Sequence, residues 1–228
     1  MYSITKYKEL IEILLLNNYS PTINWNKHDS PNTLLLRHDI DFSVEYAYEL
    51  AKVEESLNIF STFFFMLSSN MYNIFSKKNR GLIKDIAQMG HKISFHYDPT
   101  VYSNLDSFIV EKETFESLFN VEVNIVSIHR PGPFLDNNNL SLFGVDQTYQ
   151  NKFFKDMKYM SDSGGRDIFP LLDSFLSNTQ RKGLHLLIHP IWWMKESESP
   201  TETLNFWKNK NLDFITSEIR LNCKTYKE

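Results

Sequence analysis

Short apolar runs alternate with longer amphipathic stretches along the chain. The runs are rich in Leu, Ile, Val and Phe and are short, which is typical of strands buried on both faces of a parallel sheet. They lie at residues 32–41, 60–67, 91–96, 121–133 and 183–190, with a shorter one at 158–165. Apolar residues at helical spacing predict helices at 43–58, in the stretch up to Gly90, at 103–120 and 169–178, and from Thr201 onward.

This alternation predicts an α/β fold whose parallel sheet is either open or closed into a barrel. No internal repeat, low-complexity segment or Pro/Gly/Ser-rich linker divides the chain, so residues 1–228 are expected to form one domain. In either arrangement, functional residues are expected at the carboxyl ends of the strands.

The first twenty residues predict an amphipathic helix, and we expect neither a secretion signal nor a membrane span. Tyr7, Leu10 and Leu14 recur at helical spacing, whereas Glu9 and Glu12 interrupt the apolar run. No run in the chain approaches the roughly 18 apolar residues that a membrane span needs. The protein is therefore expected to be cytoplasmic.

Net charge and cysteine content limit which partners and which kinds of site are expected for this protein. The net charge is −4 and the pI is near 6.0, so neither nucleic acid nor an anionic membrane surface is expected as a partner. The single cysteine, Cys223, cannot form an internal disulfide and has no CxxC partner for zinc.

Polar, titratable residues close four of the expected strands. The strand ends read Arg37-His38-Asp39-Ile40-Asp41, His96-Tyr97-Asp98, His129-Arg130-Pro131 and His189-Pro190. Parallel strands deliver such residues to one edge of a sheet, where four coincident endings indicate a functional site.

Asp39 and Asp41 are two residues apart, so on a strand their carboxylates share a face. Two adjacent carboxylates repel each other, and a metal ion held by one would leave the other as a general base. The local sequence allows a second interpretation, in which Asp41 caps the helix that starts near Ser43 and Asp39 is a solvated turn residue.

The histidines at the strand ends also have two interpretations each. His96 fits a metal ligand beside Asp41, although an isolated strand histidine is more often a hydrogen-bonded core residue. His129 offers a second imidazole, and Arg130 a cation that either steadies the base carboxylate, binds a substrate oxyanion or forms an ordinary ion pair. His189 is a candidate general acid or a loop histidine. We expect His91 and His185 to be structural, and assign His28 no role.

The ordered series RHDID, GHKISFH, HRPGP, SDSGG and LLIHP resembles the successive motifs of the polysaccharide deacetylases, the NodB-homology esterases of the carbohydrate esterase 4 type. Within them it is most similar to the WbmS-like branch of bacterial surface-polysaccharide biosynthesis. The resemblance runs from about Thr33 to Trp193. It implies an irregular, incomplete (β/α) barrel.

The resemblance also implies roles for residues. Asp39 would be the catalytic base, Asp41 and His96 metal ligands, Arg130 the residue that orients the base, and His189 the general acid. The family places a second metal histidine four residues after the first, where this chain has Thr100, a poor zinc ligand. His129 is the first substitute for that ligand and Asp98 the second.

Together with these residues, the resemblance implies a hydrolase that uses one divalent ion, with zinc expected, to remove an N- or O-acetyl group from a sugar or glycan. A non-catalytic carbohydrate-binding domain on a degenerate scaffold is the alternative. A non-haem iron site ranks third, because two histidines and a carboxylate also describe its facial triad. Trp192 is either a sugar-contacting or a buried aromatic, and the turn at residues 162–166 either approaches the substrate or is a plain loop.

Overall fold

The computed structural model describes residues 2–102, 104–137, 140–178 and 182–227. Its first half consists of α1 (Ile4–Leu16), β1 (Ser20–Pro21), η1 (Trp25–Lys27), β2 (Thr33–Ile40), α2 (Val44–Ser56), β3 (Thr62–Phe65), α3 (Lys77–Gln88), β4 (Lys92–Tyr97) and α4 (Asp106–Phe119). Its second half consists of β5 (Ile125–Ile128), α5 (Gly132–Asn137), β6 (Asp146–Gln147), α6 (Asn151–Phe154), β7 (Lys158–Ser161), η2 (Ser163–Gly165), α7 (Phe169–Leu176), β8 (Leu184–Ile188), η3 (Pro190–Trp192) and α8 (Pro200–Asn222).

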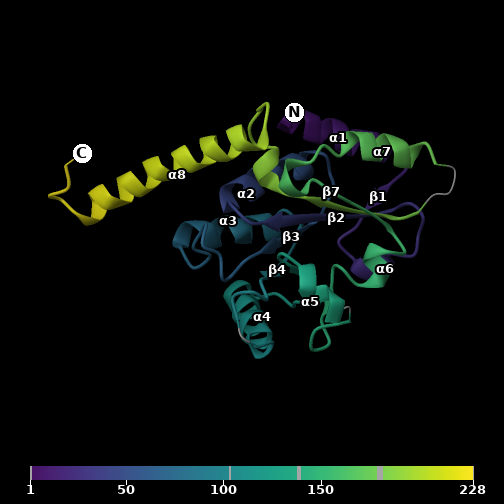
Figure 1. Ribbon diagram of the computed structural model, residues 1–228, viewed down its shortest axis with the longest axis horizontal. Coiled ribbons are helices and arrows are strands. Elements are labelled where there is room, and N and C mark those ends of the chain that lie inside the picture. Colours follow the sequence, from purple (N-terminus) through teal and green to yellow (C-terminus); the bar gives the residue numbers. More distant parts are fainter. Residues whose placement is uncertain (1, 103, 138–139, 179–181, 228) are drawn as a thin grey trace.

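One parallel sheet organises the molecule (Figure 1). Its strand order is β6-β5-β4-β3-β2-β8-β7, and β1 pairs with the start of β2. From β2 to β5 the strands follow one another in both the chain and the sheet, with α2, α3 and α4 as crossovers. Within the described ranges, the two outer strands β6 and β7 do not pair with each other. The expected fold, an incomplete (β/α) barrel, is therefore confirmed.

Local sequence explains where the first helices begin and end. Helix α1 buries Tyr7, Leu10, Ile11 and Leu14, as their spacing predicts. Ser43 caps α2, since its Oγ accepts a hydrogen bond from the backbone N–H of Tyr46 at 3.3 Å. Gly90 follows α3 with a φ of 100°, a conformation that glycine adopts without a steric penalty.

The fourth expected strand is shorter than the apolar pattern suggests. It was expected to start at Val121, but β5 starts at Ile125. Helix α4 ends at Phe119, its C-cap Asn120 is in the left-handed conformation with a φ of 55°, and residues 121–124 form the connection to the strand. Asparagine tolerates this conformation better than most residues, so the helix stops there and the first four residues of the apolar run form the connection.

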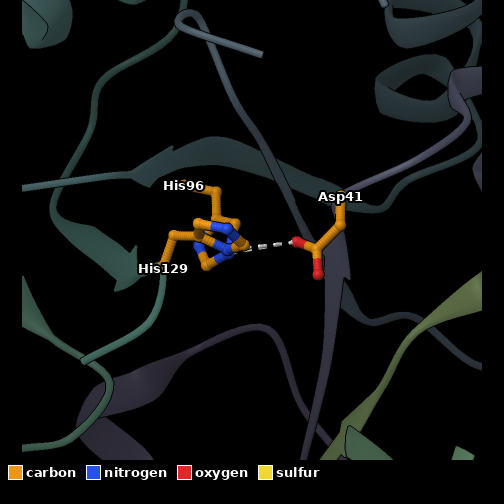
Figure 2. A group of neighbouring side chains, drawn as sticks. All are labelled: Asp41, His96 and His129. Carbon is orange, nitrogen blue, oxygen red and sulfur yellow. Dashed lines mark hydrogen bonds and ion pairs between the residues drawn. The ribbon is translucent and has the colours of Figure 1, made fainter. Parts of the chain in front are cut away.

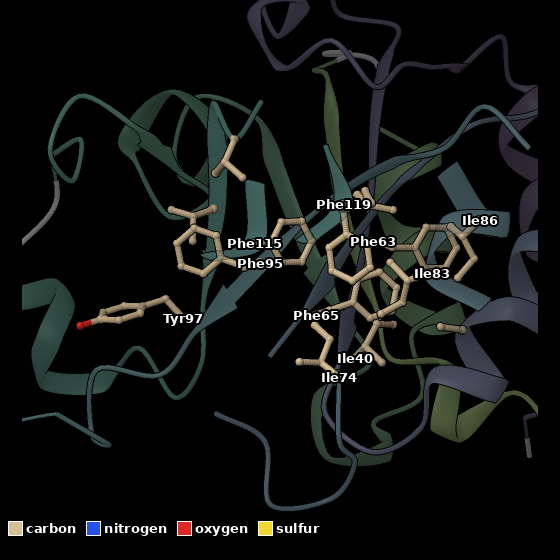
Figure 3. Close-up of a cluster of buried hydrophobic side chains, with 14 of the residues drawn as sticks. Ile40, Phe63, Phe65, Ile74, Ile83, Ile86, Phe95, Tyr97, Phe115 and Phe119 are labelled. Atoms are coloured by element: carbon tan, nitrogen blue, oxygen red, sulfur yellow. The ribbon is translucent and has the colours of Figure 1, made fainter. Parts of the chain in front are cut away.

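The core includes two large buried clusters on the outer, helix-covered face of the sheet. Figure 3 shows the cluster between the strands β2 to β4 and the helices α3 and α4, in which Phe63, Phe65 and Phe95 meet Ile83 and Phe115. A second cluster lies between β2, β8 and the helices α1, α2 and α7. Figure 1 shows α1 and α7 on the same side of the sheet.

The inward face of β2 changes from apolar to charged along the strand. Side chains alternate across a strand, so Leu35, Arg37 and Asp39 share one face. Leu35 belongs to a small buried cluster with Trp25, Phe64 and Phe153. This cluster closes the inside of the open barrel below the charged residues, and the site lies at the carboxyl end of the strand.

Helix α8 extends away from the rest of the molecule (Figure 1). Near its start, Trp207 packs against Phe42 with ring centroids 5.3 Å apart. Farther along, Leu212, Ile215 and Leu221 are exposed. No helix within the described residues is both long and apolar enough to cross a membrane.

Candidate active site

Arg37 and Asp39 form a buried ion pair on the inward face of β2. The guanidinium donates from Nε to Asp39 Oδ1 at 2.8 Å and from Nη2 to Oδ2 at 2.6 Å. Burial alone would raise the pKa of Asp39, but Arg37, with smaller contributions from His96 and His189, lowers it to about 2. Asp39 is therefore ionised at neutral pH and held in one orientation.

The cation that contacts Asp39 in the structure is Arg37, whereas the motif resemblance led us to expect Arg130 in this role. The structure shows no ion pair between Arg130 and Asp39, both of which it describes. Arg130 is exposed at the end of β5 and lines the cavity above the site. Strand alternation contained a signal for Arg37, because residues two apart on a strand share a face.

Asp41, His96 and His129 converge on one point from three different strand ends (Figure 2). His96 Nε2 lies 3.1 Å from His129 Nδ1 and 3.3 Å from Asp41 Oδ1, and His129 Nδ1 lies 3.5 Å from the same oxygen. A tetrahedral zinc with bonds of about 2.0–2.1 Å places its ligand atoms about 3.3–3.4 Å apart. The three atoms are thus spaced like one face of a zinc coordination tetrahedron.

Asp41 Oδ1 supports this interpretation, because it is buried without a hydrogen-bond donor among the described residues. A buried carboxylate oxygen without a partner is costly, and a cation between it and the two imidazoles would satisfy it. Burial acts to raise the pKa of Asp41, but His129 and His96 hold it well below the usual range. The residues present therefore fit a divalent metal ion, and they fit the facial triad of an iron site equally well.

Ser127 on β5 fixes the ring of His96. Its Oγ accepts from Arg37 Nη2 at 2.7 Å, donates to Asp39 Oδ1 at 2.9 Å and lies 2.7 Å from His96 Nδ1. Because the single hydroxyl proton goes to Asp39, His96 must donate from Nδ1. Its Nε2 then presents a lone pair to the point shared with Asp41 and His129, as a metal ligand must.

Asp98 and Thr100 form a turn beside this point. Asp98 accepts hydrogen bonds from the backbone N–H of Thr100 at 2.9 Å and from its hydroxyl at 2.6 Å. A carboxylate oxygen of Asp98 lies 3.9 Å from His129 Nε2, the nitrogen that faces away from His96. His129 and Asp98 were the two expected substitutes for the ligand missing at Thr100. His129 belongs to the cluster, whereas Asp98 lies on the far side of the His129 ring.

His189 faces the same cluster from the end of β8 and is held by Asp162. Its Nδ1 donates to Asp162 Oδ1 at 2.6 Å, and its Nε2 lies 3.8 Å from Asp41 Oδ2. Asp162 also accepts from the indole N–H of Trp193 at 2.8 Å. Burial alone would lower the pKa of His189, but Asp162, followed by Asp41 and Asp39, raises it to about 9. Sequence reasoning gave Asp162 no such role; its place after β7, beside β8, was the available signal.

The remaining histidines lie away from the cluster. His91 is buried near Ser61 and Glu54 at the start of β4, and His185 is buried against the carbonyl of Phe153. His28 lies 3.0 Å from the exposed Asp29.

A cavity of about 470 Å³ opens above the site. This volume is in the range of small-molecule sites, about 300–1,000 Å³. Its lining includes Asp39, Asp41, His96, His129 and His189. It also includes Arg130, Gly164 and Trp192, so the glycine turn and the tryptophan singled out in the sequence both border it.

No family model matches the chain, and no significant match was found among curated proteins. Solved structures with a similar fold include the peptidoglycan deacetylase PdaC from Bacillus subtilis, with 13% identity over 85% of this chain and 99% of that chain and a TM-score of 0.48. The chitin deacetylase from the fungal pathogen Colletotrichum lindemuthianum aligns with 15% identity over 84% of this chain and 86% of that chain, with a TM-score of 0.46.

The CE4 family pseudoenzyme BA3943 from Bacillus anthracis aligns with 17% identity over 84% of this chain and a TM-score of 0.45. This chain covers 63% of that protein, which is less than two thirds of its length. Because the identities and TM-scores are low, the likeness assigns no role to any residue of this chain.

Proposed function

We propose that the protein is a metal-dependent hydrolase of the polysaccharide deacetylase superfamily that removes an N- or O-acetyl group from a sugar or glycan. The convergence of Asp41, His96 and His129, with Asp39 and His189 beside them, is the observation that carries the proposal. A cytoplasmic role in surface-polysaccharide metabolism, as in the WbmS-like branch, is the finer form of the proposal and rests on the motif series alone.

Asp41, His96 and His129 would hold the ion. Two imidazole nitrogens and one carboxylate oxygen suit zinc and leave coordination positions open, as a catalytic site requires. A divalent ion there would supply Lewis acidity, which lowers the pKa of water and polarises an acyl carbonyl.

Asp39 would act as the base. Its Oδ2 lies 3.6 Å from His96 Nε2 and accepts one hydrogen bond, from Arg37, so one lone pair is left to take a proton from water. Arg37 and Ser127 fix the carboxylate and stop it from turning away. As the water oxygen bonds to the acyl carbon, the proton that water loses passes to Asp39.

His189 would act as the acid. Asp162 binds its Nδ1 and leaves Nε2 directed at the cluster, 3.8 Å from Asp41. When the bond from the acyl carbon to the sugar nitrogen or oxygen breaks, His189 would donate its Nε2 proton to that atom. The products are acetate and the free amine or alcohol.

A non-catalytic carbohydrate-binding domain is the second candidate, and one observation favours it. Asp39 accepts two hydrogen bonds from Arg37 and one from Ser127, which makes it a weak base. In that case sugars would bind but no acetate would be released.

Acetate release from N-acetylated chitooligosaccharides and O-acetylated xylo-oligosaccharides by the zinc-loaded protein tests the proposal. We expect release by the wild type and a loss of about 10²–10⁴-fold in Asp39→Asn and in His189→Asn, the usual range for a general base or acid. Asp85→Asn, on the exposed face of α3, is the matched control and should keep full activity. Binding of these sugars without release would establish the second candidate instead.

A further inference from the structure

Arg130 is a cation at the cavity without a task in the site described above. It directly follows His129 (Figure 2) at the end of β5 and lines the same cavity as Asp41 and His189. Among the described residues it is the only Arg or Lys in that lining, because Arg37 is buried beneath the cavity.

The carboxylates of the cavity already have partners other than Arg130. Asp39 is paired with Arg37, and Asp98 accepts two hydrogen bonds from Thr100. Asp41 faces the imidazoles of His96 and His129. The guanidinium of Arg130 forms no ion pair with a carboxylate of the described residues, so it is available to a ligand.

The backbone of Arg130 is strained. Its φ is 48°, in the left-handed region, which costs a non-glycine residue about 1–2 kcal/mol. Glycine, which stands two positions later, would adopt this conformation freely. Strained residues of this kind cluster at ligand sites, where the side chain has a use that offsets the strain.

Trp192 adds a second donor without a partner. The side chain is 6% exposed and lines the cavity, and its buried Nε1 has no hydrogen-bond partner among the described residues. An indole N–H can only donate, so it requires an acceptor from a ligand or from water. The cavity thus presents a free guanidinium, and Trp192 in its wall has a buried indole N–H without an acceptor among the described residues. A free guanidinium matches an anionic, oxygen-rich ligand.

We infer that the substrate of this site is an acidic sugar, whose carboxylate or phosphate group Arg130 binds. The inference rests on the proposed function, because it names the substrate class of the same site. A guanidinium binds both anions through two parallel N–H donors, so the two groups share one recognition chemistry.

Calorimetric titration with three probes tests the inference: neutral N-acetylglucosamine, its 1-phosphate, and 2-acetamido-2-deoxyglucuronic acid. The titrations use the zinc-loaded protein and are repeated after metal removal, so that binding of an anion to the metal is recognised. We expect at least one charged probe to bind about tenfold or more tightly than the neutral sugar, as a charge-assisted bidentate pair provides. The probe that shows the difference distinguishes carboxylate from phosphate.

Substitutions assign this preference to Arg130. Arg130→Gln should abolish it and Arg130→Lys should keep part of it, since lysine retains the charge without the bidentate geometry. Arg80→Gln removes one positive charge from α3, outside the cavity lining, and should leave the preference unchanged.

Two results would overturn the inference: equal affinities of the wild type for all three probes, or a preference that survives Arg130→Gln. Acetate release from neutral sugars by a wild type without such a preference would overturn the acidic-substrate inference alone. An Arg130-dependent preference in a protein that releases no acetate would support the inference and remove the hydrolase.

Discussion

Arg37 and Asp39 are both buried, so water cannot solvate either charge when its partner is removed. Removing one member of a buried ion pair typically costs about 3–5 kcal/mol. We expect Arg37→Met to lower the free energy of unfolding by that amount, measured by urea denaturation. The double variant Arg37→Met/Asp39→Asn should regain part of the loss, because no unpaired charge remains. A single-variant cost under about 1 kcal/mol would contradict a tight pair.

His185 provides a pH test at the same scale. Burial and then the nearby Arg37 lower its pKa from 6.5 to about 3. Between pH 6.5 and about 3, His185 is therefore protonated in the unfolded chain but neutral in the folded protein. The free energy of unfolding falls as the pH falls toward 3. Relative to His185→Gln, we expect the wild type to lose up to about 1.4 kcal/mol more per pH unit below about pH 6, by urea denaturation. Equal slopes would contradict a neutral buried His185.

The residues of the site were predictable where the sequence places them at a strand end, as it does Asp39, Asp41, His96, His129 and His189. The residues that contact them from other strands were not predictable. The role of Ser127 depends on the pairing of β5 with β4, and the role of Asp162 depends on the pairing of β7 with β8. Arg37 and Arg130 were both candidates to pair with Asp39, and Arg37 does so because it shares the inward face of β2.

Helix α2 is joined to its neighbours through one buried carboxylate. Glu54 Oε1 lies 2.7 Å from His38 Nε2 and accepts from the Tyr7 hydroxyl, while Oε2 accepts from Ser61 Oγ at 2.5 Å. His91 Nδ1 lies 3.5 Å from Glu54 Oε2. Burial would raise the pKa of Glu54, but His38 and then His91 lower it, so it stays ionised. The group links α1, α2, β2 and β3 on the face of β2 opposite Asp39.

We expect Glu54→Gln to lower the free energy of unfolding by about 3–5 kcal/mol, because it removes the charge that this group is built around. Glu49→Gln, at an exposed ion pair with Lys52 on the same helix, is the matched control and should cost less than about 0.5 kcal/mol. Urea denaturation of both variants measures the difference. Equal costs would mean that the buried group contributes no more than a surface pair.

Element type followed from hydrophobic periodicity for the longer segments. The two-residue strands β1 and β6 were not predicted because they contain no apolar run, and the helices α5 and α6, of six and four residues, were not predicted because they span less than two helical turns. The opening between β6 and β7 did not follow from the alternation, which fits an open sheet and a barrel equally well; only the motif resemblance implied an incomplete barrel.

At the scale of the whole molecule, α8 stands apart from the barrel. We expect a chain that ends at Asn211 to keep its melting temperature within about 2 °C, because the removed apolar side chains are exposed and about 1 kcal/mol shifts a domain of this size by about 2–4 °C. Thermal unfolding followed by circular dichroism measures this. A larger fall in the melting temperature would show that the removed part of α8 is buried by a contact in solution.

The expectation that the protein binds no nucleic acid stays a prediction from its net charge.

Zinc titration of the metal-stripped protein, followed by calorimetry, tests whether Asp41, His96 and His129 form a metal centre. We expect binding of one ion per chain by the wild type, abolished in Asp41→Ala and retained in Asp85→Asn, which removes a carboxylate outside the site. Absence of binding by the wild type, or binding that Asp41→Ala leaves unchanged, would contradict a metal centre at Asp41, His96 and His129.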